Sequence, residues 1–247
     1  LSRVLGKHGR RHWDLGMHAI RYISSTLAYG LHYTGGSQPL LTSAADASWA
    51  DDTSNSRSTC GHLISLAAGP VAWRCRQERS VCTSTTEAET AAAYHASRAI
   101  VGTRMLLQEL GLQQQEATPL ACDNKAAIQW SLGKGSVSKK KHLRLRYHAV
   151  EQAVADGHVS LFYMETSAMP ADFLTKILYP GHFALCRDRV MVNAAAATAV
   201  GSMTTANQSG TPVASSAALP ALSAAAFFSA RCASAPLPAR PAEDVYR

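Results

Sequence analysis

Closely spaced cysteine pairs are missing from this 247-residue sequence. No two of its six cysteines form a Cys-x-x-Cys pair, the spacing typical of a zinc knuckle. The scattered cysteines also argue against a dense disulfide framework, so a reducing compartment fits the sequence best. They are Cys60, Cys75, Cys82, Cys122, Cys186 and Cys232.

Long apolar runs are missing as well. The most apolar stretch, 217–230, is interrupted by Pro220, Ser223 and Ser229, so no run reaches the roughly 18 residues that a transmembrane helix needs. The chain starts with Leu1 rather than Met, and its first residues have no apolar core of the signal-peptide type. We therefore expect no membrane span and no secretion. We also expect the sequence to be a piece of a longer polypeptide or to have a mispredicted start.

Acidic residues are the scarcer charged class. The sequence has 17 Asp and Glu against 24 Lys and Arg, a formal net charge of +7. This moderate excess favours a polyanionic partner without proving one. The length is sufficient for one large domain, or for a medium domain with appendages, built around a hydrophobic core.

The C-terminal part, 193–247, differs in composition from the rest. About a third of its residues are Ala, mixed with Ser, Thr and Pro without a sustained period. Such a segment cannot pack a core, which predicts a disordered low-complexity tail. A short alanine-rich helix at 194–200 is an alternative for part of it.

Before the tail, segments typical of strands and helices alternate. Short β-like runs at 62–66 and 71–74 flank a turn at 67–70. A long helix is expected at 86–110, because Gly111 is a typical residue after a helix end. Then come a strand at 118–122, a helix start after Asp123 and Asn124, a helix at 143–157, a strand at 158–164 and a short helix at 170–178 opened by Pro170. This order predicts an α/β fold with a mixed sheet.

A separate helix is expected at 12–29, ending at Gly30. Its apolar residues Trp13, Met17, Ile20 and Leu27 could pack on a neighbour that this chain lacks. A simple connector helix is the favoured interpretation, since spacing alone says no more.

Four carboxylates are placed where this layout brings segments together. Asp46 lies in the first strand region and Glu89 in the first turn of the long helix, while Asp123 ends a strand and Asp172 starts the last short helix. Strand ends and helix starts converge on one edge of an α/β sheet. Four carboxylates there need a cation, and their hard oxygen ligands select Mg²⁺ or Mn²⁺. The pattern therefore indicates two-metal phosphoryl-transfer chemistry.

Each of these carboxylates also has a structural alternative. Glu89 follows Thr86 by three residues, as in a capping box, and Glu87 bears the same relation to Ser84. Asp123 and Asp172 could simply favour helix N-termini through the macrodipole. Spacing alone leaves both interpretations open.

The residues around the carboxylates form seven motifs in a consistent order. Together they closely resemble the ribonuclease H domain at the C-terminal end of copia-type retrotransposon polyproteins. The motifs are ADASWADD at 45–52, RSTCGH at 57–62, VAWR at 71–74, STTEAETAA at 84–92, CDNKAAI at 122–128, KHLRLRYH at 141–148 and ADFLTK at 171–176. The resemblance covers about residues 40–180. The leader at 1–39 is similar to the connection that follows the reverse transcriptase, and 181–192 is a C-terminal extension.

The resemblance implies a fold and a reaction. The fold is a mixed five-stranded sheet flanked by helices, with a helical leader and a disordered tail. Asp46, Glu89, Asp123 and Asp172 match the catalytic carboxylates, which hold two Mg²⁺ or Mn²⁺ ions. The reaction is endonucleolytic hydrolysis of the RNA strand of an RNA–DNA hybrid, leaving a 3′-hydroxyl and a 5′-phosphate. The implied partners are the hybrid and the reverse transcriptase of the same polyprotein, in cytoplasmic virus-like particles with access to the nucleus.

Several positions depart from the family pattern. They are Ser48, Thr90, Lys140, Arg144 and Ile177, and none is a proposed metal ligand. A degenerate, non-catalytic relic that keeps the fold and nucleic-acid binding is therefore the second hypothesis. An integrase-type nuclease is a weaker third, because the TEAE and CDN motifs point elsewhere.

A basic run near the fourth predicted helix is the candidate nucleic-acid surface. Phosphate contacts of this kind read no base sequence and weaken as salt rises. The alternative is a solvated helix end. His142 is a candidate proton carrier, although packing or surface roles are commoner for histidine, and Trp73 and Trp130 are expected to pack rather than to stack on bases. The candidate contacts are Asn124, Lys139, Lys140, Lys141, Arg144 and Arg146, with Arg74, Arg76 and Arg79 as an extension.

Overall fold

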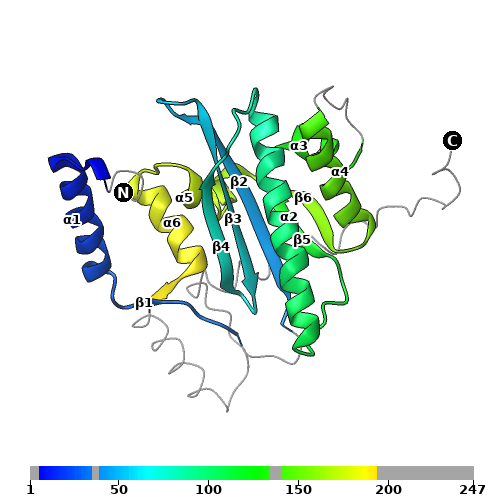
Figure 1. Cartoon of the computed structure of the whole chain (residues 1–247). Helices are drawn as coiled ribbons and strands as arrows, with labels where there is room; N and C mark the ends of the chain where they lie inside the picture. The colour runs from blue at the N-terminus through cyan, green and yellow to red at the C-terminus, as the bar shows by residue number, and fades with distance from the viewer. Residues whose placement is uncertain (1–5, 35–38, 134–140, 194–247) are drawn as a thin grey trace, which may run out of the picture.

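The computed structural model describes residues 6–34, 39–133 and 141–193. Its centre is a five-stranded sheet in the order β4-β3-β2-β5-β6, drawn in Figure 1. The strands β2 (Leu41–Asp52), β3 (Arg57–Leu66) and β4 (Gly69–Gln77) are antiparallel, whereas β5 (Thr118–Cys122) and β6 (Val159–Tyr163) continue the sheet from β2 in parallel. The predicted α/β fold with a mixed five-stranded sheet is confirmed.

The register of the antiparallel strands places Asp46 opposite Gly61, and Gly61 opposite Cys75. Alternate residues of β3 point to opposite faces of the sheet. Cys60 Sγ lies 3.7 Å from the Ala88 carbonyl oxygen of α2 (Thr85–Glu109) on one face. Gly61, on the other face, lies under α5 (Asp172–Thr175). The helices α2 and α5 therefore cover opposite faces of the sheet.

The helix α2 (Thr85–Glu109) packs on the sheet through small side chains. Ala88, Ala91, Ala92 and Ala96 are buried along its length, and they let the helix approach the strands closely. It forms the main core with residues of β2, β3, β5 and β6. Gly111 follows the helix with a φ of +76°, as a C-terminal glycine should, so the predicted helix at 86–110 is confirmed.

Two further helices, α3 (Lys125–Ser131) and α4 (Lys141–Ala155), lie beside α2 (Figure 1). Trp130 of α3 packs edge-on against Tyr147 of α4, with ring centroids 5.6 Å apart. This contact agrees with the packing role expected for Trp130. Trp73 is exposed on the edge strand β4 instead.

The segment after β6 differs from the single helix predicted at 170–178. A short 3₁₀ helix, η2 (Thr166–Ala168), precedes α5 (Asp172–Thr175), and a separate helix, α6 (Pro180–Val190), follows. The predicted helix is present but shorter, because Lys176 has extended backbone and ends α5 at Thr175, and Pro180 then starts α6 at the N1 position. The extension at 181–192 is thus mostly helical.

The leader begins with α1 (Arg10–Ser25), which ends four residues before the predicted end of that helix. Tyr29 and Gly30 form the short strand β1 (Tyr29–Gly30), paired antiparallel with β7 (Val192–Asn193). Because these residues join a two-stranded ladder, the helix cannot continue through them. This pairing connects the leader to the segment that follows α6.

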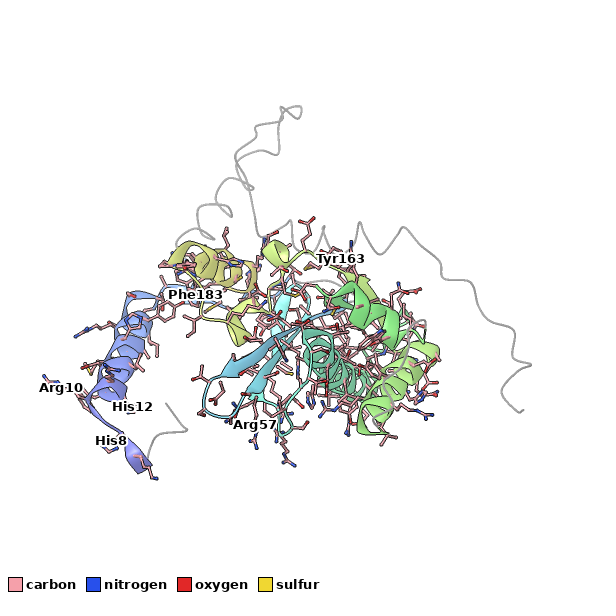
Figure 2. The ribbon with its side chains drawn as sticks, turned by 90° about the horizontal axis from the view of Figure 1, so that it is seen from above. His8, Arg10, His12, Arg57, Tyr163 and Phe183 are labelled. Carbon is pink, nitrogen blue, oxygen red and sulfur yellow. The ribbon has the colours of Figure 1, made fainter. Side chains whose placement is uncertain are left out.

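Side-chain contacts also attach the leader to the rest of the chain. Tyr22 of α1 packs edge-on against Phe183 of α6, the residue labelled in Figure 2 on the side of α6 that faces α1. Tyr33 Oη donates to the Pro70 carbonyl oxygen at 2.8 Å. A Cβ at Gly69 would lie 2.5 Å from the Tyr33 ring, so glycine is required for this contact.

Several apolar residues of α1 and of the segment that follows it are exposed. Trp13 is 69% exposed, and Ile20 and Leu27 are exposed too. Packing of these residues on a neighbour outside the chain stays a prediction. None of the described helices combines the length and apolarity needed to cross a membrane. The five cysteines of the described residues form no disulfide, and the predicted tail, apart from Asn193, lies outside the described residues.

Candidate active site

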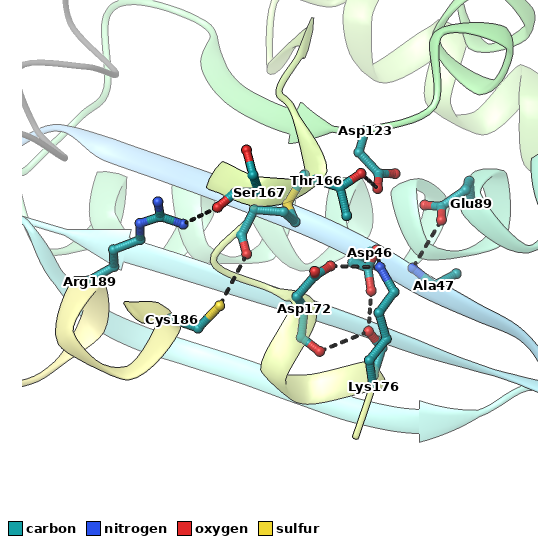
Figure 3. Close-up of polar contacts among 12 residues, drawn as sticks. Asp46, Ala47, Glu89, Asp123, Thr166, Ser167, Asp172, Lys176, Cys186 and Arg189 are labelled. Atoms are coloured by element: carbon teal, nitrogen blue, oxygen red, sulfur yellow. Dashed lines mark hydrogen bonds and ion pairs between the residues drawn. The ribbon is translucent and has the colours of Figure 1, made fainter. Parts of the chain in front are cut away.

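The structure brings together the four carboxylates singled out from the sequence (Figure 3). Asp46 comes from the middle of β2, Glu89 from the N-terminal part of α2, Asp123 from the end of β5 and Asp172 from the start of α5. Oxygen atoms of Asp46, Asp123 and Asp172 lie within 4.8 Å of one another. Glu89 forms a second such group with Asp123 and Cys122. Asp123 therefore links two halves of one cluster.

Asp46 and Asp172 form the half of the cluster that contacts a positively charged side chain, Lys176. Their side chains are only 0% and 1% exposed, so their charges need compensation. Lys176 Nζ lies 2.9 Å from Asp46 Oδ1 and 2.7 Å from Asp172 Oδ1. Thr175 Oγ1 donates to the other oxygen of Asp46. Burial acts to raise the pKa of Asp172, against the effect of Lys176.

Glu89 lies in the other half of the cluster, where no cationic side chain of the described residues contacts it. The Ala47 backbone N–H donates to Glu89 Oε1 at 3.3 Å, and Glu89 Oε2 is buried with no hydrogen-bond partner among the described residues. Burial, together with the negative charges of Asp46 and Asp123, raises the pKa of Glu89 to about 9. Asp123 is half-buried and accepts a 2.8 Å hydrogen bond from Thr166 Oγ1. A buried, unpartnered carboxylate oxygen facing other carboxylates is an environment that a divalent cation would stabilise.

The capping alternative applies to Glu87 and not to Glu89. Ser84 is the N-cap of α2, and its side chain accepts a hydrogen bond from the Glu87 backbone N–H. The Glu87 carboxylate turns back to the backbone N–H and hydroxyl of Thr83 at 2.8 and 2.7 Å. Glu89 points instead toward Ala47 of β2, so helix capping does not account for it.

No role was predicted from the sequence for Lys176, Thr175, Thr166 or Gly61. Lys176 follows Asp172 by four residues, a spacing at which opposite charges on a helix meet, and this signal could have identified it. Gly61 had no such signal. A Cβ there would lie 2.7 Å from Thr175 Cγ2 and 2.9 Å from Leu174 Cβ, so glycine is what lets α5 approach Asp46.

The predicted nucleic-acid residues are only partly described. Lys139 and Lys140 lie outside the described residues, and the side chains of Lys141 and His142 do too, although their backbone starts α4. Arg144 is exposed on α4. Asn124 is the N-cap of α3, where its Oδ1 accepts from the Ala127 backbone N–H at 2.9 Å.

Arg146 has a structural partner. Its Nη2 donates to Glu78 Oε2 at 2.8 Å, and His95 Nε2 lies 2.6 Å from Glu78 Oε1. Burial acts to raise the pKa of Glu78, but the His95 hydrogen bond and the Arg146 charge hold this pKa at about 2. This cluster of Glu78, His95 and Arg146 joins the end of β4 to α2 and α4.

No protein-family model matches the chain, but curated relatives do. It is 34% identical over 190 residues to the retrovirus-related Pol polyprotein from transposon TNT 1-94 of Nicotiana tabacum, covering 77% of this chain and 14% of the relative. It is 31% identical over 178 residues to the Pol polyprotein from transposon RE2 of Arabidopsis thaliana, covering 72% and 12%. Among solved structures, RNase H1 of Halobacterium salinarum NRC-1 aligns with a TM-score of 0.41 at 14% identity, over 55% of this chain and 93% of that chain.

The sheet order and the carboxylate cluster on it define a ribonuclease H-like domain. Over most of its length, the chain is homologous to copia-type Pol polyproteins, as the sequence motifs predicted. It spans only about one seventh of the length of these curated relatives. It thus combines a ribonuclease H-like fold with homology to one part of retrotransposon Pol polyproteins.

Proposed function

We propose that this chain hydrolyses the RNA strand of RNA–DNA hybrids by a metal-dependent endonucleolytic reaction. The observation that carries the proposal is the convergence of carboxylates from four elements, with Glu89 Oε2 buried and unpartnered. Such a set is unfavourable unless a cation compensates it. The homology to Pol polyproteins supports this reaction class over other uses of the fold.

The side chains present fit divalent metal ions. Asp46, Asp123 and Asp172 would hold one ion, and Glu89 with Asp123 a second. All of these donors are hard carboxylate oxygens, which suit Mg²⁺ or Mn²⁺. Two such ions, when bound, activate a water molecule and stabilise the leaving oxyanion of a phosphodiester.

The protein positions these ligands through hydrogen bonds from neighbouring side chains. Thr175 holds Asp46, and Thr166 holds Asp123 from the 3₁₀ helix η2. Ligands fixed in this way keep the geometry that the reaction needs. The scissile phosphate would be cleaved to a 3′-hydroxyl and a 5′-phosphate.

The basic run on α4 supports the hybrid as substrate. Arg144 is exposed, and Lys139, Lys140, Lys141 and His142 lie beside it in the chain. We assign Asn124 and these lysines to backbone contacts, which makes binding salt-dependent. His142 is retained as the candidate proton carrier. Arg146 is the weakest member of this set, since it is already paired with Glu78.

Two further assignments follow from the homology. The reverse transcriptase part of the same polyprotein is the proposed protein partner, because the curated relatives are Pol polyproteins. The cytoplasmic particle in which such a polyprotein acts is the proposed location, with access to the nucleus.

Cleavage of an end-labelled RNA–DNA hybrid in Mg²⁺ tests the proposal. The wild-type chain should cut the RNA strand, and Asp123→Asn should not. Asp156→Asn is the matched control, because Asp156 is exposed at the far end of α4 and bonds only to Gln152 and its own helix. Equal cleavage by wild type and Asp123→Asn would reject the proposal. Hybrid binding without cleavage by any variant would instead establish the non-catalytic relic.

A further inference from the structure

The ammonium group of Lys176 is bound to two of the carboxylates that the proposed function gives to a metal ion. It lies between Asp46 Oδ1, at 2.9 Å, and Asp172 Oδ1, at 2.7 Å (Figure 3). The other Asp46 oxygen accepts from Thr175, so both Asp46 oxygens are engaged. No cation contacts the Glu89 carboxylate among the described residues.

A divalent ion and this ammonium compete for these two carboxylates. Both are cations, and they would lie within a few ångströms of each other in a buried site, where repulsion is weakly screened. One must leave for the other to bind. Lys176 is 29% exposed and has a flexible four-carbon stem, so its ammonium can move into solvent, whereas both aspartates are fixed in the fold.

We propose that Lys176 is a displaceable internal counter-ion. In the metal-free protein it compensates Asp46 and Asp172 and keeps both in place, and the ion that binds this pair must displace it. The inference rests on the proposed metal site. In this role Lys176 is a positioning residue: it holds the two aspartates in place and lowers the affinity of the chain for the metal ion.

Mn²⁺ titration of the full chain by calorimetry, without nucleic acid, tests the competition. Lys176→Met should bind Mn²⁺ more tightly than wild type, on the order of tenfold, which is within the usual range of coupling between linked binding events. Lys125→Met is the matched control for loss of a nearby positive charge. Lys125 directly follows the Asp123-Asn124 pair, but its ammonium lies 4.6 Å from the Tyr163 ring centroid. No ion pair joins it to the four carboxylates among the described residues. Its effect should stay below about twofold because exposed charges are screened.

Thermal unfolding of the same variants tests the counter-ion role. In EDTA, Lys176→Met should melt below wild type, because two buried carboxylates lose their cation. Saturating Mn²⁺ should close this gap. Lys176→Arg, which keeps the charge, should recover stability in EDTA without the tight Mn²⁺ binding.

The outcomes separate this inference from the proposed function. Equal or weaker Mn²⁺ binding by Lys176→Met would overturn the counter-ion, even where wild type cleaves hybrids normally. A gap in melting temperature that persists in Mn²⁺ would overturn it too. If Lys176→Met binds Mn²⁺ more tightly but the wild-type chain cleaves no hybrid, the counter-ion role of Lys176 would be supported and the proposed nuclease activity rejected.

Discussion

Two buried glutamates, eleven positions apart in the sequence, have opposite ionisation behaviour. Glu78 is 4% exposed and Glu89 is 7% exposed, so burial penalises both charges. Glu78 contacts His95 and Arg146, and its pKa falls to about 2. Glu89 has one backbone donor and two neighbouring aspartates, and its pKa rises to about 9. Burial alone therefore says nothing about function: a compensated carboxylate connects elements, while an uncompensated one marks the candidate site.

The largest expected effect is on stability at Glu78. Replacing Glu78 by Gln leaves the half-buried Arg146 guanidinium without its carboxylate, which should cost about 3 kcal/mol of unfolding free energy. Urea unfolding in EDTA, followed by tryptophan fluorescence, measures this. The same change at Glu89 is the control and should cost nothing, because near neutral pH the folded chain must keep this carboxyl protonated, and Gln avoids that free-energy cost. Equal losses of unfolding free energy in Glu78→Gln and Glu89→Gln would contradict the difference between the two glutamates.

The second effect is on cleavage. Glu89→Gln should lower the rate of hybrid cleavage by about a hundredfold or more, the loss typical when a group that stabilises developing charge is removed. Glu78→Gln, assayed at a temperature where it stays folded, should cut at close to the wild-type rate. Single-turnover cleavage at saturating Mg²⁺ compares them directly. Retained cleavage activity in Glu89→Gln would show that Glu89 is not needed for the reaction.

The third effect is on pH dependence in EDTA. The pKa of Glu89 is higher in the folded chain than in the unfolded one, so its contribution to stability is complete below pH 4.5 and is lost as pH rises toward about 9. The pKa of Glu78 is lowered, so its contribution is complete above pH 4.5 and is lost as pH falls toward about 2.

Of the two glutamates, only Glu89 changes its contribution to stability between pH 5 and pH 8. Unfolding free energy should therefore fall by up to about 1.4 kcal/mol per pH unit in wild type relative to Glu89→Gln. Urea titrations of both proteins across this range measure the difference. Parallel curves for the two proteins would contradict the raised pKa of Glu89.

The smallest effect comes from Gly61. A methyl group there would press on Thr175 and Leu174, so Gly61→Ala should cost about 1–2 kcal/mol of stability. It should also weaken Mn²⁺ binding, because α5 would carry Asp172 and the Asp46 partner Thr175 away from β2. Ser65→Ala, in the same strand but beyond α5, is the control. Loss of stability with unchanged Mn²⁺ affinity would show that Gly61 does not position the site.

Local sequence patterns predicted the parts of this fold that local chemistry determines. The long helix α2 has a capping serine, an alanine-rich face and a terminal glycine, and all three were visible in the sequence. The four carboxylates were named from their places at strand ends and helix starts, and the structure brings them together. Their catalytic role stays a prediction.

Long-range contacts were not predictable in this way. Arg146 was assigned to nucleic acid because it lies in a basic run, but its partner Glu78 is 68 positions away. Lys176 lies in a motif that was identified, yet its contact with Asp46 spans 130 positions and depends on how α5 lies over Gly61. The two-residue strands β1 and β7 carry no periodicity at all, so nothing in the sequence pairs them.

The pairing of β1 with β7 has a practical consequence for dissecting this polypeptide. A version trimmed to begin at residue 40 would strip β7 of its ladder partner and remove the Tyr33 ring from above Gly69. The shortest fragment worth purifying therefore starts ahead of Tyr29 and runs past Asn193.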